Sequence, residues 1–300
     1  MRSVLAVIGF CMAVVCSAQI TVMSYNTENF FYPETDSINP DVEYTPQGSR
    51  HWSYTRYIRK TEQIARVIAN SVEDGCPAIV ALNEVEDVRC LEALCRKMPH
   101  YPYRIVHFDS HDHRGIDVAL LYDTTRCRLL HAQPITPLAH TRDLLYAAFQ
   151  TETDTLHVVA CHLPSQLSGV ASRMRRDSVK AVIRHIADSL VACSAETKII
   201  VCGDMNMSPE EDLLPLRNLM VGMSAGTHKY RGIWTCLDQF YVSEALLPRT
   251  EVCIFDASWL QEEDMKHLGT RPRRTFVGFR YNRNGFSDHL PILLKLAPKS

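Results

Sequence analysis

Short runs of apolar residues, rich in β-branched side chains, recur along the whole chain. Runs of this kind, bounded by polar or turn-forming residues, are typical of β-strands. The predicted strands are Ile20–Tyr25, Ala78–Leu82, Tyr103–Phe108, Asp117–Tyr122, Leu156–Cys161, Lys198–Cys202, Gln239–Ser243, Glu251–Phe255 and Leu290–Leu296.

Other segments repeat their apolar residues at helical spacing. One such face is shared by Ile58, Ile64, Val67 and Ile68. A second begins behind a capping aspartate, Asp87, and is shared by Val88, Leu91, Leu94 and Cys95. A third, longer face is shared by Val179, Val182, Ile183, Ile186 and Leu190. Many strands and several helices, in no strict alternation, predict an α/β fold with two packed sheets flanked by helices.

Polar side chains stand at the ends of the predicted strands. Asp204 and Asn206 follow the strand that begins at Lys198, and residues two apart in an extended chain point the same way. Other strands end or begin with the same kinds of residue, namely Asn26, Glu84, His162, Asp238, Asp288 and His289. A single polar strand end is usually a turn former. Their repetition in distant parts of the chain predicts one shared site at the edge of the sheets.

The residue types at these ends point to a particular chemistry. Glu84, Asp204 and Asp288 are hard oxygen donors, which suit Mg²⁺ or Mn²⁺ better than a structural zinc ion. Such an ion can neutralise charge on a phosphoryl group. Asp238 and His289 can form a pair in which the carboxylate fixes the histidine tautomer and raises its basicity. A metal site beside a His–Asp pair indicates hydrolysis of a phosphate ester.

Composition and charge narrow the class of protein. The chain has 300 residues, 46% hydrophobic and 22% charged, which is typical of a globular protein, and no linker long enough to divide it. Its formal net charge of −2 provides no global positive field for nucleic acid, so a polyanion must be bound locally. Of the 11 cysteines several lie inside apolar strands and none forms a CxxC pair, so neither a disulfide framework nor a zinc ribbon is predicted.

The first residues of the chain resemble a secretory signal. A positive start at Arg2 is followed by an apolar stretch too short to span a bilayer and by small residues before Gln19. We therefore predict a signal peptide over residues 1–18 and a secreted or periplasmic mature protein. A lipoprotein anchor at Cys16 is less favoured because Val15 precedes it, and an uncleaved anchor remains an alternative. No stable membrane insertion is expected after cleavage.

Several segments, in chain order, resemble the endonuclease/exonuclease/phosphatase family, which includes pancreatic-type deoxyribonuclease, apurinic endonucleases, neutral sphingomyelinases and inositol phosphatases. They are "MSYNTENF", "ALNEVE", "GIDVALLY", "CHLPS", "GDMN", "LDQFYVS" and "FSDHLPI". The resemblance extends from about Ile20 to Leu296 and assigns residues 19–300 to one domain of this family. It implies a four-layered α/β sandwich of two mainly antiparallel sheets with the active site at the sheet edges.

The resemblance also implies roles for individual residues. Glu84 is expected to be the main metal ligand, with Asn26 and Asp288 assisting. Asp204 would orient or deprotonate the attacking water or protonate the leaving group, and Asn206 would donate to a phosphate oxygen. His289, oriented by Asp238, would contact the scissile phosphate or act as base, and His162 would serve as a further donor or acid. Which group is the general base stays open. Gln239 beside Asp238 is a departure from the family pattern.

Basic residues near these motifs are candidates for substrate binding. Arg114 precedes "GIDVALLY", where its place is similar to that of a phosphate-contacting residue in the family, but a surface arginine beside a turn is an equal alternative. Arg274 lies in an arginine-rich and aromatic stretch over 271–289, whose alternative interpretation is a long loop kept soluble by its charge. A second basic and aromatic stretch covers 50–60 around Trp52, whose alternative interpretation is a helix start packed on the core. The stretch over 107–117 contains His107, His111 and His113 and could hold a metal, but a solvated loop is the preferred interpretation.

These observations predict a divalent-metal-dependent phosphoesterase that uses Mg²⁺ or Mn²⁺. Phosphodiester bonds in DNA or RNA are the first expected substrate, and the protein is expected to be a monomer. A phosphatase or phosphodiesterase acting on a lipid headgroup, a sugar phosphate or a nucleotide is the main alternative. A binding protein that has lost catalysis is less favoured, because all of the matched acidic residues and histidines are present.

Overall fold

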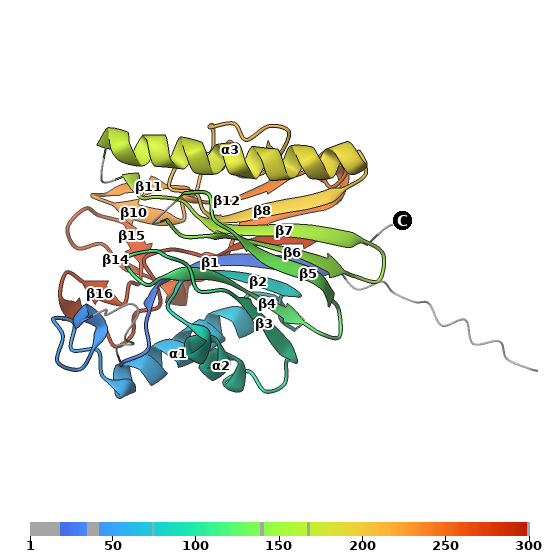
Figure 1. The fold of residues 1–300 in the computed structure, drawn as a ribbon. Coiled ribbons are helices and arrows are strands. Elements are labelled where there is room, and N and C mark those ends of the chain that lie inside the picture. Colours follow the sequence, from blue (N-terminus) through green and yellow to red (C-terminus); the bar gives the residue numbers. More distant parts are fainter. Residues whose placement is uncertain (1–18, 35–41, 74, 139–140, 167–168, 299–300) are drawn as a thin grey trace, which may run out of the picture.

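The computed structural model describes residues 19–34, 42–73, 75–138, 141–166 and 169–298 (Figure 1). The predicted signal peptide over residues 1–18 lies outside the described residues. Two six-stranded sheets lie face to face in the middle of the molecule, with helices on their outer sides. The predicted four-layered α/β sandwich is therefore confirmed.

The first sheet is built around the N-terminal strand. Its strand order is β13-β18-β1-β2-β4-β3, and only β1 and β2 run parallel. The bounds are β1 Ile20–Phe30, β2 Ile79–Val85, β3 Tyr103–His107, β4 Asp117–Asp123, β13 Thr250–Ile254 and β18 Ile292–Leu296.

The second sheet repeats this plan. Its strand order is β5-β6-β7-β8-β12-β9, and only β7 and β8 run parallel. The bounds are β5 Arg128–Ile135, β6 Leu144–Gln150, β7 Thr155–His162, β8 Lys198–Asp204, β9 Arg217–Asn218 and β12 Asp238–Val242. Both sheets are thus mainly antiparallel, as predicted.

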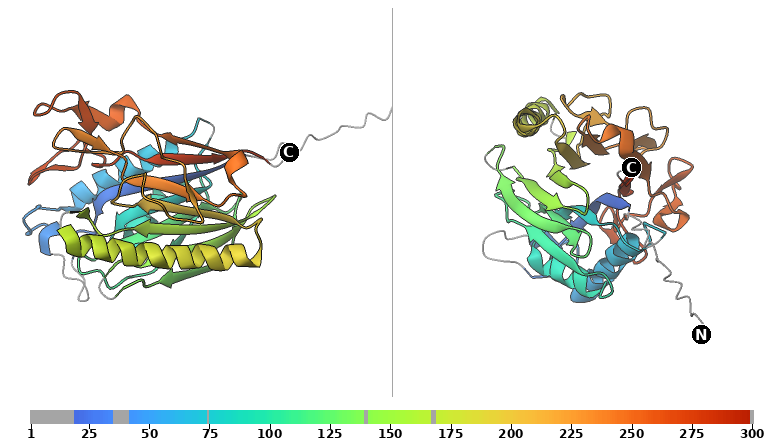
Figure 2. Two further views of the ribbon diagram at one scale, coloured as in Figure 1. Left: turned by 90° about the horizontal axis from the view of Figure 1, so that it is seen from above. Right: turned by 90° about the vertical axis from the view of Figure 1, so that its right-hand side faces the viewer.

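Helices cover the outer faces of the two sheets. Helices α1 (Tyr54–Ala69) and α2 (Val88–Arg96) lie on the first sheet, and α3 (Gly169–Cys193) lies along the second (Figures 1 and 2). The alternation of side chains along a strand explains both contacts. In β8, Ile200 and Cys202 belong to the core between the sheets, whereas Ile199 and Val201 pack with α3.

All three predicted helices are present. Asp87 caps α2 as expected, since its carboxylate accepts a hydrogen bond from the backbone N–H of Cys90. Three strands of the two large sheets were not predicted, namely β5, β6 and the two-residue β9. β5 is an edge strand with mostly exposed side chains, so it lacks an apolar run, and β6 carries small alanines in its middle. Among the described residues, no helix is long and apolar enough to cross a membrane.

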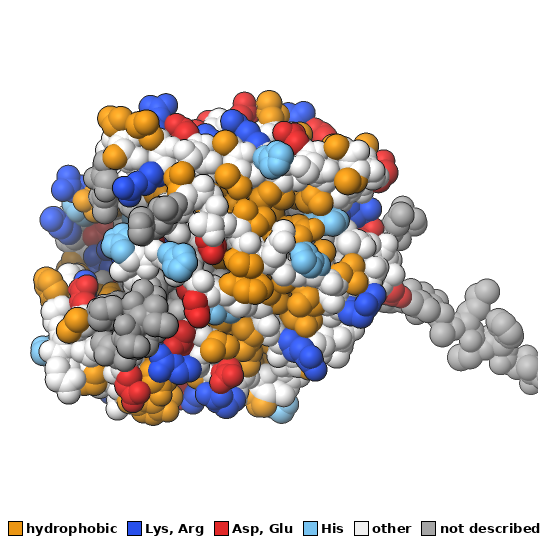
Figure 3. Space-filling model, viewed as in Figure 1, with side chains coloured by type: hydrophobic (Ala, Val, Ile, Leu, Met, Phe, Trp, Pro, Cys, Tyr) orange, Lys and Arg blue, Asp and Glu red, His pale blue; other side chains and the backbone are white. Residues whose placement is uncertain are grey.

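Three small hairpins extend the sheets at one end of the molecule. They are β10 (His228–Tyr230) with β11 (Ile233–Thr235), β14 (Gln261–Glu263) with β15 (Thr270–Pro272), and β16 (Phe276–Val277) with β17 (Arg280–Tyr281). Figure 1 shows them at the end opposite the chain termini. Acidic and basic side chains are interspersed on the face in Figure 3, which has no broad basic patch.

Candidate active site

The predicted strand ends meet where the two parallel strand pairs end. Across β7 and β8, His162 is the register partner of Asp204, and across β1 and β2, Asn26 is the partner of Asn83. The side chain of Asn83, fully buried, links the two sheets. It donates to the carbonyl oxygen of Cys161 at 2.9 Å and accepts from the backbone N–H of Asp204 at 3.1 Å. These bonds bring together the ends of both sheets that carry the predicted site residues.

The backbone bends sharply at the site. Glu28, Glu84 and Asn206 have positive φ angles of 55°, 62° and 48°, an unusual conformation for residues with a side chain. Gly203 has φ 145°, and a Cβ atom there would lie 1.7 Å from the carbonyl oxygen of Cys161. Strained positions of this kind are found often at functional sites, where they fix the direction of side chains.

Asp204 lies at the centre of the cluster. Its two carboxylate oxygens accept hydrogen bonds from the side-chain amide of Asn26 at 3.1 Å and from the backbone N–H of Asn206 at 3.0 Å. The side-chain amide of Asn206 donates to the carbonyl oxygen of Leu163 at 3.0 Å. Burial, together with nearby Asp238 and Glu84, raises the pKa of Asp204 to about 7, although His289 opposes the shift. This carboxyl group can therefore take up a proton near neutral pH.

His289 and Asp238 form the predicted pair. His289 Nδ1 lies 2.7 Å from Asp238 Oδ2, so its Nε2 faces the site at 3.8 Å from Asp204 Oδ2. Burial disfavours the charged imidazole, but the carboxylates of Asp238 and Asp204 outweigh it and raise the pKa of His289 well above its usual range. The ring is thus held in one orientation and is a cation whose Nε2 faces the carboxylates of Asp204 and Asp288.

Glu84 and His162 complete the centre. Glu84 Oε2 accepts a hydrogen bond from the backbone N–H of Asn29 at 2.9 Å, and Oε1 lies 3.9 Å from His162 Nε2. His162 Nε2 is also 3.5 Å from Asp204 Oδ2. Burial, and after it the guanidinium of Arg142, lowers the pKa of His162 well below its usual range, so this histidine is neutral.

The remaining predicted residues lie at the rim. Arg114 donates to Asn29 Oδ1 at 2.7 Å and lies 3.9 Å from Glu84. Arg274 donates to the carbonyl oxygen of Lys229 at 3.1 Å, and its buried Nε has no hydrogen-bond partner among the described residues. Asp288 does not begin a strand as expected, because it lies in a bend before β18, with Oδ1 4.0 Å from His289 Nε2. The structure thus brings all the predicted site residues to one region.

Two residues beside the catalytic groups were not predicted. Arg142 Nη1 contacts the ring nitrogens of His162 at 2.7 and 3.0 Å, and its side chain is 10% exposed. The ring of His228 lies beside that of His289, tilted by 37° with centroids 4.8 Å apart, and its Nε2 is 3.9 Å from Asp288. Arg142 had no sequence signal, because it is an isolated arginine before an unrecognised strand. His228 lies in the segment "GTHKYRG", whose basic and aromatic residues were the only sequence signal for it.

A buried lysine supports the loop that carries Arg274 and Asp288. Lys60 Nζ donates to Thr275 Oγ1 at 2.6 Å and to the carbonyl oxygen of Phe286. Burial lowers the pKa of Lys60 to about 8, while Glu28 and Asp288 act in the opposite direction. The side chain of Lys60 is therefore structural, although the sequence placed it in a basic stretch with a possible substrate role.

The two basic and aromatic stretches pack against each other. Trp52 is fully buried in the core, which confirms the helix-start interpretation for this residue. Arg50 lies over the rings of Phe276 and Phe279 at 5.0 and 4.8 Å, and Arg56 lies over Tyr281 at 4.5 Å. Many of the cationic and aromatic side chains of these two stretches therefore contact each other and are not free to bind substrate.

The donor set at the centre fits a divalent cation. The oxygens of Glu84, Asp204 and Asp288 and the amide of Asn26 are hard ligands of the kind that Mg²⁺ and Mn²⁺ prefer. The raised pKa of Asp204 has burial and neighbouring carboxylates among its causes, which is the situation that a positive ion relieves. Ligand atoms of His228, Asp288 and His289 also lie within 4.8 Å of one another at the edge of this centre.

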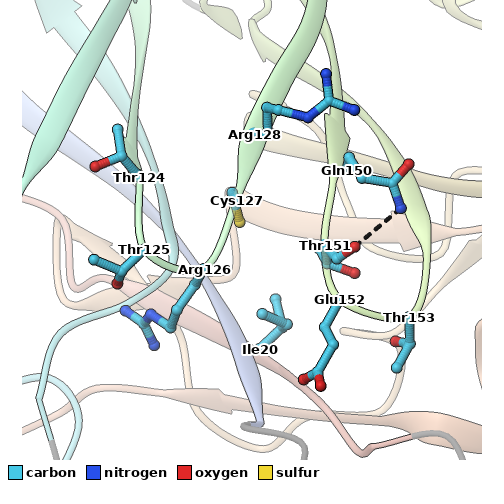
Figure 4. A pocket seen from close by; sticks show the side chains of 10 residues that line it. All are labelled: Ile20, Thr124, Thr125, Arg126, Cys127, Arg128, Gln150, Thr151, Glu152 and Thr153. Atoms are coloured by element: carbon cyan, nitrogen blue, oxygen red, sulfur yellow. Dashed lines mark hydrogen bonds between the residues drawn. The ribbon is translucent and has the colours of Figure 1, made fainter.

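A cavity of about 430 Å³ lies elsewhere (Figure 4). It is formed where β1 begins, beside the turns that join β4 to β5 and β6 to β7. Its lining residues are Ile20, Thr124, Thr125, Arg126, Cys127, Arg128, Gln150, Thr151, Glu152 and Thr153. None of the predicted site residues lines this cavity, so it does not change the assignment of the candidate active site.

Comparison with known proteins finds one family profile and several solved structures that are similar to the chain. A profile described as "Endonuclease/Exonuclease/phosphatase family" matches residues 21–298. A search of curated proteins found no match. Truncated Caenorhabditis elegans TDP2 is similar in structure, with a TM-score of 0.62 and 16% identity over 93% of this chain and 98% of that one.

Two further solved structures share the fold. D. rerio TDP2 complexed with single strand DNA product has a TM-score of 0.59 and 12% identity over 94% of this chain and 100% of that one. The human Nocturnin catalytic domain with bound sulfate anion has a TM-score of 0.54 and 16% identity over 93% of this chain and 94% of that one. At these identities the likeness shows the fold alone.

Proposed function

Because the chain belongs to the endonuclease/exonuclease/phosphatase family, whose members are phosphoesterase hydrolases, we propose that it hydrolyses phosphodiester bonds with a divalent metal ion. The observation that supports this proposal most directly is the pairing of His289 with Asp238 at 2.7 Å, with Nε2 of the histidine facing Asp204. The pair stands beside Glu84 and Asn26, so acid–base groups and metal ligands share one centre.

The side chains suggest a division of labour. Asp204, whose pKa is raised to about 7, accepts a proton from the attacking water or delivers one to the leaving oxygen. Protonated His289, held by Asp238, donates a hydrogen bond to the phosphoryl group and stabilises negative charge that develops there. Glu84, Asn26 and Asp288 would hold the Mg²⁺ or Mn²⁺ ion, which would supply further charge neutralisation at the phosphoryl oxygens.

Other donors surround the space where the phosphate would lie. His162 is neutral and can donate from one ring nitrogen, and Arg142 and Arg114 approach from the same side. Asn206 would have to release its bond to Leu163 to contact substrate. Although burial acts in the opposite direction, the guanidinium of Arg274 is close enough to Asp288 to help His289 lower the pKa of that carboxyl group. A positively charged rim around buried carboxylates is expected for a site that binds a phosphate ester.

Single-stranded nucleic acid is the proposed first substrate, because one structural neighbour was solved with a single strand DNA product. The net charge of −2 and the interspersed charges on the face in Figure 3 do not favour tight, non-specific binding of duplex DNA. The lack of a strong positive field also makes small phosphate esters a second candidate substrate. We further propose export to the periplasm or the medium, based on the predicted signal peptide over 1–18, and a monomeric state.

The test is hydrolysis of a panel of substrates by the purified protein. Single-stranded DNA, plasmid DNA, single-stranded RNA, a bis-aryl phosphodiester and an aryl phosphomonoester would be assayed with Mg²⁺ or Mn²⁺ and again with chelator. We expect chelator-sensitive cleavage of nucleic acid that disappears in Glu84→Ala and His289→Ala, while thermal unfolding shows that both variants are folded. Cleavage of the small esters alone would support the second candidate. Full activity in either variant would reject the assigned site.

A further inference from the structure

Ligand-type side chains also gather at the base of the loop between β3 and β4. His107 is the last residue of β3, Asp117 is the first residue of β4, and Asp109 lies between them. Ligand atoms of these three residues lie within 4.8 Å of one another. His107 Nδ1 is 3.8 Å from Asp109 Oδ1, and His107 Nε2 is 3.6 Å from Asp117 Oδ2.

The buried imidazole of this cluster is unsatisfied. The side chain of His107 is 5% exposed, so the expectation of a solvated loop was wrong for this residue. Its Nε2 has no hydrogen-bond partner among the described residues, and the 3.6 Å to Asp117 is too long for a hydrogen bond. Buried polar atoms are nearly always paired, and a bound ion or water is a common explanation for an exception.

The neighbouring carboxylate is already oriented toward His107. Asp117 Oδ1 accepts hydrogen bonds from the backbone N–H of Ser110 at 3.1 Å and from the Ser110 hydroxyl. Its other oxygen, Oδ2, is the one that faces His107. Outer hydrogen bonds that fix the orientation of a carboxylate in this way are characteristic of metal sites.

We propose that His107, Asp109 and Asp117 bind a divalent cation of the Zn²⁺ or Mn²⁺ class, separate from the catalytic ion. One imidazole and two carboxylates suit these ions better than Mg²⁺. Ligands at about 2.1 Å from a tetrahedral ion lie about 3.4 Å apart. The 3.6 Å between His107 Nε2 and Asp117 Oδ2 is close to this value. Asp109 lies nearer the other ring nitrogen, within the 4.8 Å that encloses the three ligand atoms, so its carboxylate must move toward Nε2, which its 83% exposed side chain permits.

The proposed cation is connected to the active site through the loop. The Ser110 hydroxyl, which contacts Asp117, also accepts from the backbone N–H of Asp112 at 3.4 Å. Asp112 Oδ1 accepts from the backbone N–H of Arg114 at 2.9 Å, and its Oδ2 lies 3.6 Å from Arg142 Nε. A cation that orders the loop between β3 and β4 would therefore also fix the positions of Arg114 and Arg142. This consequence depends on the proposed function, whereas cation binding itself does not.

The experiment measures binding without catalysis. Zn²⁺ binding would be measured by calorimetric titration into the Glu84→Gln variant. Excess Mg²⁺ would be present to occupy any remaining hard-oxygen site. In a second measurement, Co²⁺ binding would be followed by visible absorption. We expect a Zn²⁺ site whose affinity falls at least about tenfold in Asp109→Asn and in His107→Gln, whereas any Zn²⁺ bound by His228, Asp288 and His289 should be unaffected by these two substitutions. His185→Gln, on the exposed side of α3, is the matched control and should bind as the parent does.

Each outcome decides the proposal. Absence of Zn²⁺ binding, or equal affinity in the parent and in His107→Gln, would overturn it. A loss of affinity in His111→Gln and His113→Gln but not in Asp109→Asn would identify adventitious chelation by exposed loop histidines and would also overturn it. Asp109 is exposed, so Asp109→Asn should fold normally, and metal-free thermal unfolding checks this. Zn²⁺ binding with no phosphoesterase activity would retain this site and reject the proposed function.

Discussion

Asp238 holds one ring nitrogen of His289 and leaves the other facing Asp204. Asp238→Asn keeps the size of this side chain but can present an amide N–H to Nδ1, which favours the wrong tautomer. We expect kcat to fall by about 10²- to 10⁴-fold with a much smaller change in KM. Steady-state kinetics would measure this, with the exposed Asp256→Asn as control. A variant with unchanged kcat would show that the pair is not part of the chemistry.

His228 should make the stability of the metal-free protein depend on pH. Burial, and after it the charge of His289, lowers the pKa of His228 from 6.5 to about 4. The unfolded chain therefore binds a proton between pH 6.5 and pH 4 that the folded protein does not bind, and stability falls as pH falls through this window. Between pH 7 and pH 4.5, we expect the unfolding free energy of His228→Gln to fall by about 2 kcal/mol less than that of the wild type. Urea unfolding at pH 7 and pH 4.5 measures the difference, and parallel losses would contradict it.

The placement of individual residues was only partly predictable. Asp204, Asp238 and His289 stood out because each adjoins an apolar strand, and strand ends of packed sheets come together. Arg142 and the burial of His107 could not be read from the sequence. Their environments are created by loops whose paths depend on tertiary contacts, and neither residue belongs to a periodic pattern.

At the scale of elements, the hairpin β10–β11 supports both members of the His–Asp pair. The Thr227 hydroxyl accepts from the backbone N–H groups of Leu237 and Asp238 at 3.1 and 3.2 Å. The Thr227 carbonyl oxygen accepts from the backbone N–H of Leu290, next to His289, at 2.7 Å. One buried residue thus positions both the start of β12, which carries Asp238, and the segment before β18, which carries His289.

Thr227→Val removes this hydroxyl while keeping the shape of the side chain. Two buried N–H groups lose their acceptor, so we expect a loss of about 1 to 3 kcal/mol in unfolding free energy and a lower kcat. Thr227→Ser restores the acceptor and should recover most of both quantities. Chemical denaturation and kinetics on the two variants test this. Equal behaviour of the valine and serine variants would show that the hydroxyl does not position the pair.

The elements themselves were more predictable than their ends. Helices α1 and α2 were found because their apolar spacing and the Asp87 cap are local features. β1 continues to Phe30, beyond the apolar run that ends at Tyr25, because its register with β2 shifts between Asn26 and Phe30. β5 was missed because an exposed edge strand has no apolar signature. Strand ends and edge strands are determined by pairing between strands that are distant in the sequence, which local propensity cannot predict.

At the scale of the whole molecule, the site exists only where the two sheets meet. The first sheet supplies Asn26 and Glu84, and the second supplies His162 and Asp204. Asn83 joins them through hydrogen bonds to the carbonyl oxygen of Cys161 and the backbone N–H of Asp204. Packing of the sheets and assembly of the site are therefore expected to be coupled.

Asn83→Ala tests this coupling. It leaves two buried backbone groups at the sheet interface without partners, so we expect a loss of about 2 to 4 kcal/mol in unfolding free energy. Because one of these groups is the N–H of Asp204, the variant should also lose metal-dependent activity at temperatures where it remains folded. Asn218→Ala is the comparison. The side chain of Asn218 donates to Pro209 and Gln239 and accepts from the backbone N–H of Met220, and all three lie in or beside the second sheet. The stability of this variant should fall while activity persists. Equal loss of activity in both variants, at matched stability, would indicate that Asn83 acts through general stability and not through the junction of the sheets.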